Sequence, residues 1–432
     1  MKMPGAFGLS RDDTDPVIAS ADRILTRGDL AQASETLAAG IAAAGISRIM
    51  VHSDDPLHIL RAVDAASRTG ADLIIAHTNL PAAHIDTVIA SFGVQMIISA
   101  EDRVTGLPPT EEGRGRVFMM TSGTTGAPKI AAHSLDALMS RARAAMGPGS
   151  KGAKWLLTYQ PTGFAGIQVQ LTAVAGRGLI VAPEARTPAG FLEAAKANGV
   201  NQISATPTFW RAFLMVVRPG DLALRQVTLG GEAADQATLD RIRKAFPDAR
   251  VTHIYASTEA GVVFSVHDGL EGFPAEWLDT DNRGVSLRVR DGLLQIRTPN
   301  AMKGYVSNTA QPLLDDGWLS TADRVEIRGN RAYILGRDDS TINVAGSKVY
   351  PLMIEQFLLS QPGVLEARVY GVTNPISGQL VAADLVLDPA VDPAATRSAV
   401  LAAAREHLAQ YQVPRVVKVV DAIAVRESGK KG

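Results

Sequence analysis

The residues best suited to chemistry in this sequence lie at positions 122–129, SGTTGAPK, shortly after the apolar run 117–120. Glycines allow backbone N–H groups to turn toward an anion, hydroxyls add hydrogen-bond donors, and a lysine supplies a positive charge. The combination predicts a cradle for a polyphosphate such as that of ATP. It is not a Walker P-loop, because Ala127 and Pro128 separate Gly126 from Lys129 and Ile130 follows the lysine. Taken alone, the segment could also be a polar turn after a strand.

Further polar segments follow the loop in order along the chain. They are GGEA at 230–233, YASTE at 255–259, GWLSTAD at 317–323, GRDDS at 336–340, INVAGSKVYP at 342–351 and RESGK at 426–430. Together with the loop, these segments resemble the motifs of the adenylate-forming superfamily, which contains acyl-CoA and aryl-CoA synthetases, luciferases and peptide-synthetase adenylation domains. The resemblance extends from about residue 29 to residue 430 and so covers nearly the whole chain.

The resemblance assigns one group of residues to ATP. The β- and γ-phosphates would be held by Ser122, Gly123, Thr124, Thr125, Gly126 and Lys129. The adenine would be lined by Gly231, Glu232, Ala233, Tyr255, Ala256 and Ser257, with the tyrosine stacked on the base. Asp323 would accept hydrogen bonds from both ribose hydroxyls, which suits an acceptor-only carboxylate, and Arg337 would contact the nucleotide. Each of these residues taken singly could be an ordinary turn or loop residue.

The resemblance also implies three catalytic residues. Thr258 would meet the α-phosphate, and Glu259 would help to hold Mg²⁺, a hard cation that offsets phosphate charge. Lys430 would bridge the substrate carboxylate and the α-phosphate, where negative charge builds up in the transition state. The alternative for this last segment is a basic tail, in which Lys431 competes with Lys430.

Two more assignments concern the second half of the implied reaction. Asp339 takes the position of the hinge between two domains, and Ala345, Gly346 and Ser347 would line the path of a thiol. Ala256, Ala322 and Ala345 stand where the family usually has glycine. An added methyl group at position 345 would narrow a path for pantetheine.

The acyl group of the substrate is expected in a small, apolar pocket. Its predicted lining is Phe164, Ala165, Gly166, Thr206, Pro207, Phe209 and Gly230. Relatives that activate amino acids have an aspartate where this chain has Ala165, so the resemblance disfavours an α-amino acid and favours an aryl or modest acyl acid. The two phenylalanines could instead be core residues.

The elements that must position these residues alternate in type. Helical patterns at 30–44, 56–69, 189–198 and 235–246 are each followed by a β-branched run, at 48–52, 71–77, 202–205 and 250–255. This rhythm predicts βαβ units with parallel sheets covered on both faces. After about residue 284 shorter strands predict an antiparallel subdomain, and from 353 the order is helix, strand, strand, long helix and strand. The predicted fold is therefore α/β, with a large N-terminal domain at 1–337 and a small, mobile α+β domain at 338–432.

The composition limits the number of domains and the kinds of partner that the chain can have. A chain of 432 residues is too long for one core, and 43 basic against 44 acidic residues give no field that would attract nucleic acid or an anionic membrane. There is no cysteine, which excludes disulfides and a thiol nucleophile. The start of the chain does not resemble a secretory signal and no long apolar run follows, so a cytoplasmic protein is expected. A homodimer is compatible with the sequence.

The sequence predicts an enzyme that uses ATP to convert a carboxylic acid to an acyl-adenylate, releases pyrophosphate and passes the acyl group to a thiol. Coenzyme A is the favoured acceptor. A stand-alone enzyme that loads the phosphopantetheine of an acyl carrier protein is one alternative. The other is a nucleotide-binding regulator without turnover, which the alanines at positions 256, 322 and 345 motivate.

Overall fold

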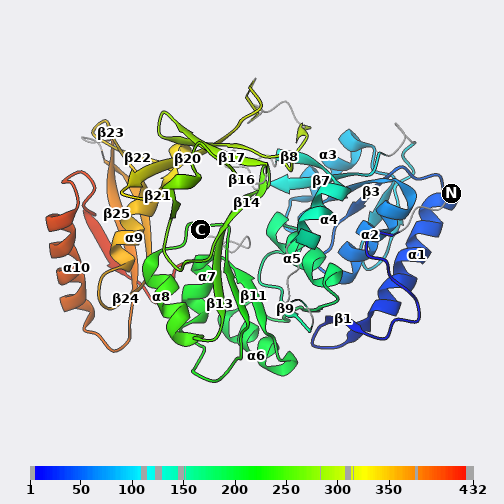
Figure 1. Ribbon diagram of the computed structural model, residues 1–432, viewed down its shortest axis with the longest axis horizontal. Helices are drawn as coiled ribbons and strands as arrows, with labels where there is room; N and C mark the ends of the chain where they lie inside the picture. Colours follow the sequence, from blue (N-terminus) through cyan, green and yellow to red (C-terminus); the bar gives the residue numbers. More distant parts are fainter. Residues whose placement is uncertain are drawn as a thin grey trace.

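The computed structural model describes residues 5–108, 114–121, 129–144, 150, 152–282, 284–306, 313–314, 316–374 and 378–424. Two large mixed sheets and an antiparallel sheet form the N-terminal part, and a smaller α+β domain follows (Figure 1). The predicted fold class is therefore confirmed.

The seven-stranded sheet contains the strand that leads into the predicted phosphate loop. In spatial order its strands are β19 (Gly304–Tyr305), β8 (Lys129–Ser134), β7 (Arg116–Thr121), β4 (Asp72–Ile75), β3 (Arg48–Val51), β5 (Met96–Ile98) and β6 (Arg103–Val104). Residues alternate between the two faces of each strand, and both faces are covered. One face packs on α1 (Arg27–Ala43), α2 (Pro56–Thr69) and α4 (Leu135–Ala144), and the other on α3 (Ala82–Phe92).

Local signals explain where these helices begin and end. The predicted helix at 56–69 is found with the same bounds, because Asp55 caps its first turn, Pro56 is its first residue and Gly70 ends it in a left-handed conformation. Helix α1 begins three residues before the predicted start. The reason is a capping box, in which Thr26 and Asp29 satisfy each other's backbone N–H groups.

The eight-stranded sheet positions the second group of site residues. Its order is β14 (Gly261–Val266), β13 (Arg250–Ser257), β12 (Gln226–Leu229), β11 (Gln202–Ala205), β9 (Lys154–Leu156), β10 (Leu179–Val181), β1 (Pro16–Ala19) and β2 (Ile24–Thr26). The core beside it is formed with α5 (Phe164–Ala175), α6 (Pro188–Asn198), α7 (Pro207–Phe213) and α8 (Gln236–Ala245). Strands β11 and β12 are parallel with Ala205 opposite Leu229. Thr206 and Gly230 therefore leave the sheet at the same edge.

The antiparallel sheet follows, as predicted. Its order is β15 (Phe273–Pro274), β21 (Arg331–Arg337), β20 (Leu319–Arg328), β18 (Leu293–Arg297), β17 (Val285–Arg290) and β16 (Asp281–Asn282), with the 3₁₀ turn η1 (Ala275–Trp277) beside it. Antiparallel pairing places Asp323 directly opposite Arg337. Two residues that the sequence assigned to the nucleotide are thereby neighbours.

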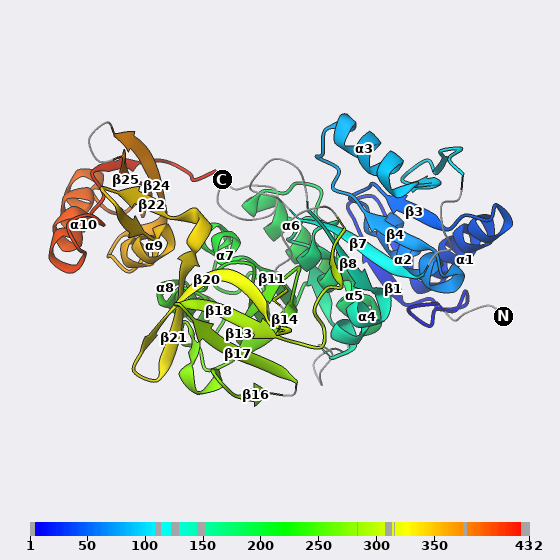
Figure 2. The same ribbon diagram turned by 90° about the horizontal axis from the view of Figure 1, so that it is seen from above.

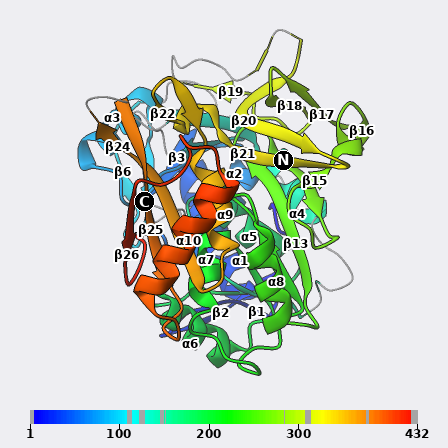
Figure 3. The same cartoon turned by 90° about the vertical axis from the view of Figure 1, so that its left-hand side faces the viewer.

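The C-terminal part forms its own core after the 3₁₀ turn η2 (Asp338–Ser340). Its strands are β23 (Ser347–Val349), β22 (Ile342–Val344), β25 (Gly378–Leu387), β24 (Val364–Asn374) and β26 (Val416–Val419), and its helices are α9 (Pro351–Leu359) and α10 (Pro393–His407). Ile354 of α9 and Val400 of α10 belong to the same apolar cluster as Val369 and Val381 of the two long strands. Figure 2 shows this domain at one end of the molecule, and in Figure 3 that end faces the viewer.

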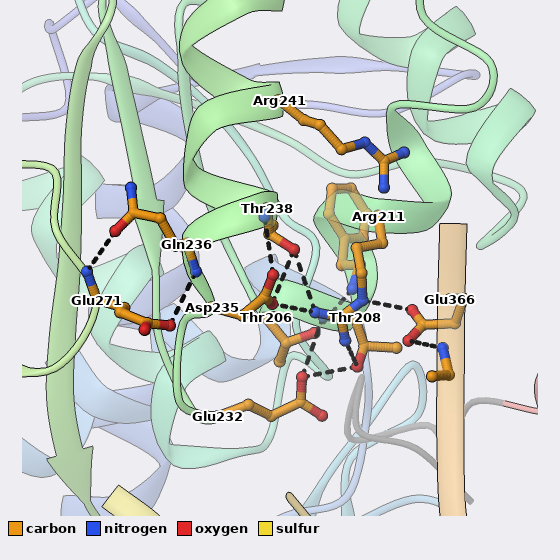
Figure 4. A network of polar contacts seen from close by, with 12 residues as sticks. Thr206, Thr208, Arg211, Glu232, Asp235, Gln236, Thr238, Arg241, Glu271 and Glu366 are labelled. Atoms are coloured by element: carbon orange, nitrogen blue, oxygen red, sulfur yellow. Dashed lines mark hydrogen bonds and ion pairs between the residues drawn. The ribbon is translucent and has the colours of Figure 1, made fainter. Parts of the chain in front are cut away.

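A buried ionic network joins the two parts (Figure 4). Arg211 of α7 donates from Nε to Glu366 of β24 at 2.6 Å and from Nη1 to Asp235, the N-cap of α8, at 2.9 Å. The Arg211 and Glu366 side chains are only 4% and 6% exposed. The Arg241 guanidinium also donates to the backbone oxygen of Leu365, at 3.2 Å. The small domain is thus held against α7 and α8 by a cation that pairs with one carboxylate from each domain.

Candidate active site

The residues predicted for the nucleoside meet where the second and third sheets approach. The Tyr255 hydroxyl, from β13, donates a hydrogen bond to the Asp323 carboxylate of β20. Burial and the Asp323 charge hold the pKa of Tyr255 well above its ordinary value, so the phenol remains a donor. The ring of Phe264 stacks on Tyr255 at 5.3 Å between centroids. A base stacked on Tyr255 would have to use the other face of the ring.

Arg337 lies opposite Asp323 and is paired with the predicted hinge residue. Its Nε and Nη2 donate to the two carboxylate oxygens of Asp339 at 3.0 and 2.9 Å. These hydrogen bonds raise the pKa of Arg337, so it stays charged. These two hydrogen bonds join Arg337, the last residue of β21, to Asp339 in the turn η2. The chain enters the small domain through this turn.

A second cluster gathers around Glu259, the predicted metal ligand. The Glu259 carboxylate accepts a hydrogen bond from the Tyr305 hydroxyl, and Nζ of Lys129 lies 5.5 Å from the centre of the Tyr305 ring. Burial and the Glu259 charge raise the pKa of Tyr305. Strand β19 brings Tyr305 here, because it pairs with β8 and places Tyr305 opposite Ala131. Sequence reasoning missed Tyr305, and no motif pointed to it.

The glycine-rich segment after β12 has a partly structural role. Gly231 has a left-handed φ of +84°, and a Cβ on Gly230 would lie 2.9 Å from the Ile254 side chain. The Glu232 carboxylate accepts from the backbone N and the hydroxyl of Thr208 at 3.0 and 2.7 Å. That carboxylate is therefore engaged with α7, and any contact with a base from 231–233 would come from the backbone.

The predicted acyl-pocket residues begin two helices. Thr206 caps α7 by accepting from the Phe209 backbone N at 3.0 Å, and Pro207 is its first residue. The Phe209 ring packs against Phe191 at 5.0 Å and Phe213 at 5.3 Å, an aromatic cluster that gives it a core function. Phe164, Ala165 and Gly166 form the first turn of α5.

Two basic residues that the sequence reasoning missed lie beside Phe164. The His133 ring is 5.9 Å from the Phe164 ring, and the Arg141 guanidinium is 5.8 Å from it. Two polar side chains thus lie next to a residue that the sequence assigned to a small, apolar acyl pocket. Alternation along β8 puts Lys129 and His133 on one face, a signal that would have found the histidine. Arg141 follows on α4, within a helix that the sequence analysis did not assign.

The remaining predicted residues are placed as follows. Ala256 and Ser257 end β13, Thr258 and Glu259 lie in the turn after it, and the Ser257 hydroxyl accepts from the Ala260 backbone N at 3.0 Å. Ala345 and Gly346 form the turn between β22 and β23, and Ser347 begins β23, in the small domain at one end of the molecule and apart from β7 and β8 (Figures 1 and 2). Ser122, Gly123, Thr124, Thr125, Gly126 and Lys430 lie outside the described residues.

Two kinds of feature are absent from the described residues. No three or more His, Cys, Asp or Glu side chains gather there as a metal site, so Glu259 would need oxygen ligands from the nucleotide or from water. None of the described helices is both long and apolar enough to cross a membrane.

Most of the chain matches known protein families. A model of the AMP-binding enzyme family matches residues 108–306, and a model of the AMP-binding enzyme C-terminal domain matches residues 353–430. The chain is 25% identical to fatty acid–[acyl-carrier-protein] ligase MmaC of Mycobacterium marinum, over 89% of this chain and 86% of that protein. It is 29% identical to a probable 2-succinylbenzoate–CoA ligase of Mycobacterium tuberculosis, over 73% and 82%.

The fold is also that of solved structures. The o-succinylbenzoate coenzyme A synthetase MenE of Bacillus subtilis, in complex with ATP and a magnesium ion, superposes with a TM-score of 0.73. The sequences are 21% identical, and the match covers 100% of this chain and 98% of that one.

Proposed function

Because the chain belongs to the adenylate-forming superfamily of AMP-binding enzymes, we propose that it is an AMP-forming acid–thiol ligase. In the first step a carboxylate oxygen of the substrate attacks the α-phosphorus of ATP, and pyrophosphate leaves. In the second step a thiol attacks the carbonyl carbon of the acyl-adenylate, and AMP leaves. No protein nucleophile is needed, so the chain contributes chiefly position and charge.

The observation that carries this proposal is the meeting of Tyr255, Asp323 and Arg337. They come from three strands, and they present an aromatic face, an acceptor and a cation at one place. A nucleoside monophosphate needs those three groups, for the base, the ribose hydroxyls and the phosphate respectively. Residues 231–233 would line the base with backbone groups.

Glu259 and Lys129 form the phosphate side of the proposed site. Glu259 is the described carboxylate that would hold Mg²⁺, which when bound offsets phosphate charge during the displacement. The Tyr305 hydroxyl orients this carboxylate, and the same ring faces Lys129. The loop 122–126 would enclose the β- and γ-phosphates, Thr258 would meet the α-phosphate, and Lys430 would bridge it to the substrate carboxylate.

The thiol acceptor is proposed to be coenzyme A, with a carrier-protein phosphopantetheine as the second candidate. The M. tuberculosis relative supports the first and MmaC supports the second. We place the domain boundary at 338–341, with Asp339 as the hinge that carries residues 345–347 toward the adenylate. A cytoplasmic location, the absence of nucleic-acid and membrane partners and a homodimer stay predictions.

The test is acid-dependent exchange of labelled pyrophosphate into ATP, across a panel of aryl and acyl acids. Exchange with at least one acid is expected. Lys430→Ala should abolish it, and Lys431→Ala, the matched control, should not. Tight nucleotide binding without exchange for any acid would instead identify a nucleotide-binding regulator without turnover. With the best acid, free coenzyme A is then compared with loaded carrier proteins.

A further inference from the structure

Arg141 is a buried cation without a described partner. The side chain is 7% exposed, and its three guanidinium nitrogens make no hydrogen bond within the part of the chain that the structure describes. Burial lowers the pKa of Arg141 to about 10, so it remains charged at neutral pH. A buried charge is normally paired, because its removal from water is costly.

None of the described carboxylates forms an ion pair or a hydrogen bond with Arg141. The Phe164 ring at 5.8 Å offers a weak cation–π contact. The guanidinium otherwise lies against Gly261, where a Cβ would be 2.2 Å from Cζ of Arg141. Segments 122–128 and 145–149, which adjoin β8 and α4 in the chain, contain no aspartate or glutamate.

His133 is a second buried polar side chain near Arg141. It is 2% exposed, and neither ring nitrogen meets the geometric criterion for a hydrogen bond with a described residue, although the Thr258 backbone is close enough to raise the pKa of His133 in part. Burial, and then the Arg141 charge, lower the pKa of His133 to about 4, so the ring is neutral at pH 7 and carries one N–H donor. The pair therefore presents several donors and a single positive charge.

The position of the pair ties it to the proposed acyl site. Phe164 begins α5, and Gly261 lies two residues beyond Glu259 at the start of β14. Glu259 is close enough to raise the pKa of His133 in part. The unpartnered donors thus lie next to the predicted acyl residues, and not on an outer surface.

We propose that Arg141 and His133 form the receptor for a second carboxylate on the substrate, so that the enzyme activates one end of a dicarboxylic acid. The planar guanidinium can donate two parallel N–H bonds to a carboxylate, and His133 can add a third. One positive charge matches one carboxylate better than a phosphate dianion. The apolar spacer between the two carboxylates packs on Phe164. For the second carboxylate to reach Arg141, the side chain of Phe164 or of Arg141 must change rotamer, because the guanidinium nitrogens are buried from solvent.

This inference rests on the proposed function and is tested with matched acids. Pyrophosphate exchange is measured with dicarboxylic acids of several lengths, aliphatic and aryl, and with the monomethyl ester of each. For at least one skeleton the wild type should prefer the diacid by ten-fold or more in kcat/KM, which is about 1.4 kcal/mol. Arg141→Met should remove this preference. Arg143→Met, on the exposed side of the same helix, should retain it. A diacid no better than its ester in every pair, or an unchanged preference in Arg141→Met, would overturn the proposal.

Two further measurements separate a receptor from a structural role. Without ligand, Arg141→Met should raise Tm, because a buried unpaired charge is replaced by an apolar side chain. A lower Tm would mean that the arginine supports the fold, and would count against the receptor. Calorimetric binding of a diacid to wild type but not to Arg141→Met supports the receptor even if no acid gives exchange. Exchange with monocarboxylic acids alone would retain the proposed function and reject the second carboxylate.

Discussion

At the scale of single residues, the orientation of Glu259 depends on one hydroxyl. Tyr305 donates to its carboxylate and also faces Lys129, so it links the predicted metal ligand to the predicted phosphate lysine. An aspartate or glutamate that must hold a metal works best when a neighbouring group fixes its rotamer. Tyr305 is therefore proposed to position Glu259 without touching the reacting atoms.

Tyr305→Phe tests this positioning. The variant keeps the ring over Lys129 and removes the hydrogen bond to Glu259. A hydrogen bond to a charged group contributes about 1.5–3 kcal/mol, so kcat/KM for pyrophosphate exchange should fall roughly ten-fold or more, with a raised requirement for Mg²⁺. Tyr333→Phe, on β21 beside Arg328, is the control and should retain activity. Unchanged exchange and Mg²⁺ dependence in Tyr305→Phe would contradict the assignment.

Two alanines that replace family glycines occupy a conformation that suits glycine. Ala322 has φ +61° and Ala345 has φ +49°, both left-handed. This conformation costs a residue with a side chain about 1–2 kcal/mol. Glycine avoids that cost, but it also increases the conformational entropy of the unfolded chain, which offsets part of the gain. We expect Ala322→Gly to raise the free energy of unfolding by up to about 1 kcal/mol in denaturant titration. Ala256 has no such φ, and Ala256→Gly should be destabilising. The opposite order of the two variants would show that the strain is absent.

At the scale of elements, the first turn of α5 depends on a close backbone approach. A Cβ on Gly166 would lie 2.1 Å from the backbone oxygen of Gln160, so α5 can begin where it does only with glycine there. Because Phe164 and Ala165 belong to the same turn, this approach also sets the wall of the proposed acyl pocket.

Gly166→Ala should therefore displace α5 or destabilise the protein by about 2 kcal/mol or more. Gly40→Ala in α1 is the matched control. That glycine is helical and exposed with no atom near its missing Cβ, so alanine should stabilise by about 0.5–1 kcal/mol. Both are measured by urea unfolding. Equal effects would mean that α5 adjusts without cost.

At the scale of the whole molecule, the Arg211–Glu366 pair holds the small domain in the observed position. The pair is buried, and its breakage leaves Arg211 with Asp235 alone. If residues 338–341 are the hinge, rotation of the small domain must break this pair. The network then favours one domain arrangement over another.

Glu366→Gln should release the small domain without unfolding the large one. Cleavage of the 338–341 segment by a protease should accelerate roughly ten-fold, since a charged hydrogen bond of about 1.5–3 kcal/mol is weakened. The ratio of adenylation to thioester formation should change as well. Glu326→Gln removes an exposed ion pair with Arg328 and should alter neither quantity. An unchanged cleavage rate in Glu366→Gln would show that the interface does not depend on the pair.

The sequence predicted most accurately those helices and strands whose signals lie within a few neighbouring residues. The strand at 202–205 and the helix at 56–69 were predicted with their observed bounds, because period, caps and breakers all lie within a few residues. The family motifs likewise named Tyr255 and Asp323 as parts of one site, and the structure places them in contact.

The sequence by itself determined the class of fold and the family, since motif order and apolar period are properties of the linear chain. Only the tertiary structure decided that Tyr305 orients Glu259, that Arg141 faces Phe164 and that Arg211 meets Glu366. The first contact depends on the pairing of β19 with β8, the second on the packing of α4 against α5, and the third on the docking of two domains across 155 positions. Such contacts follow from register and packing between distant segments, which no local pattern specifies.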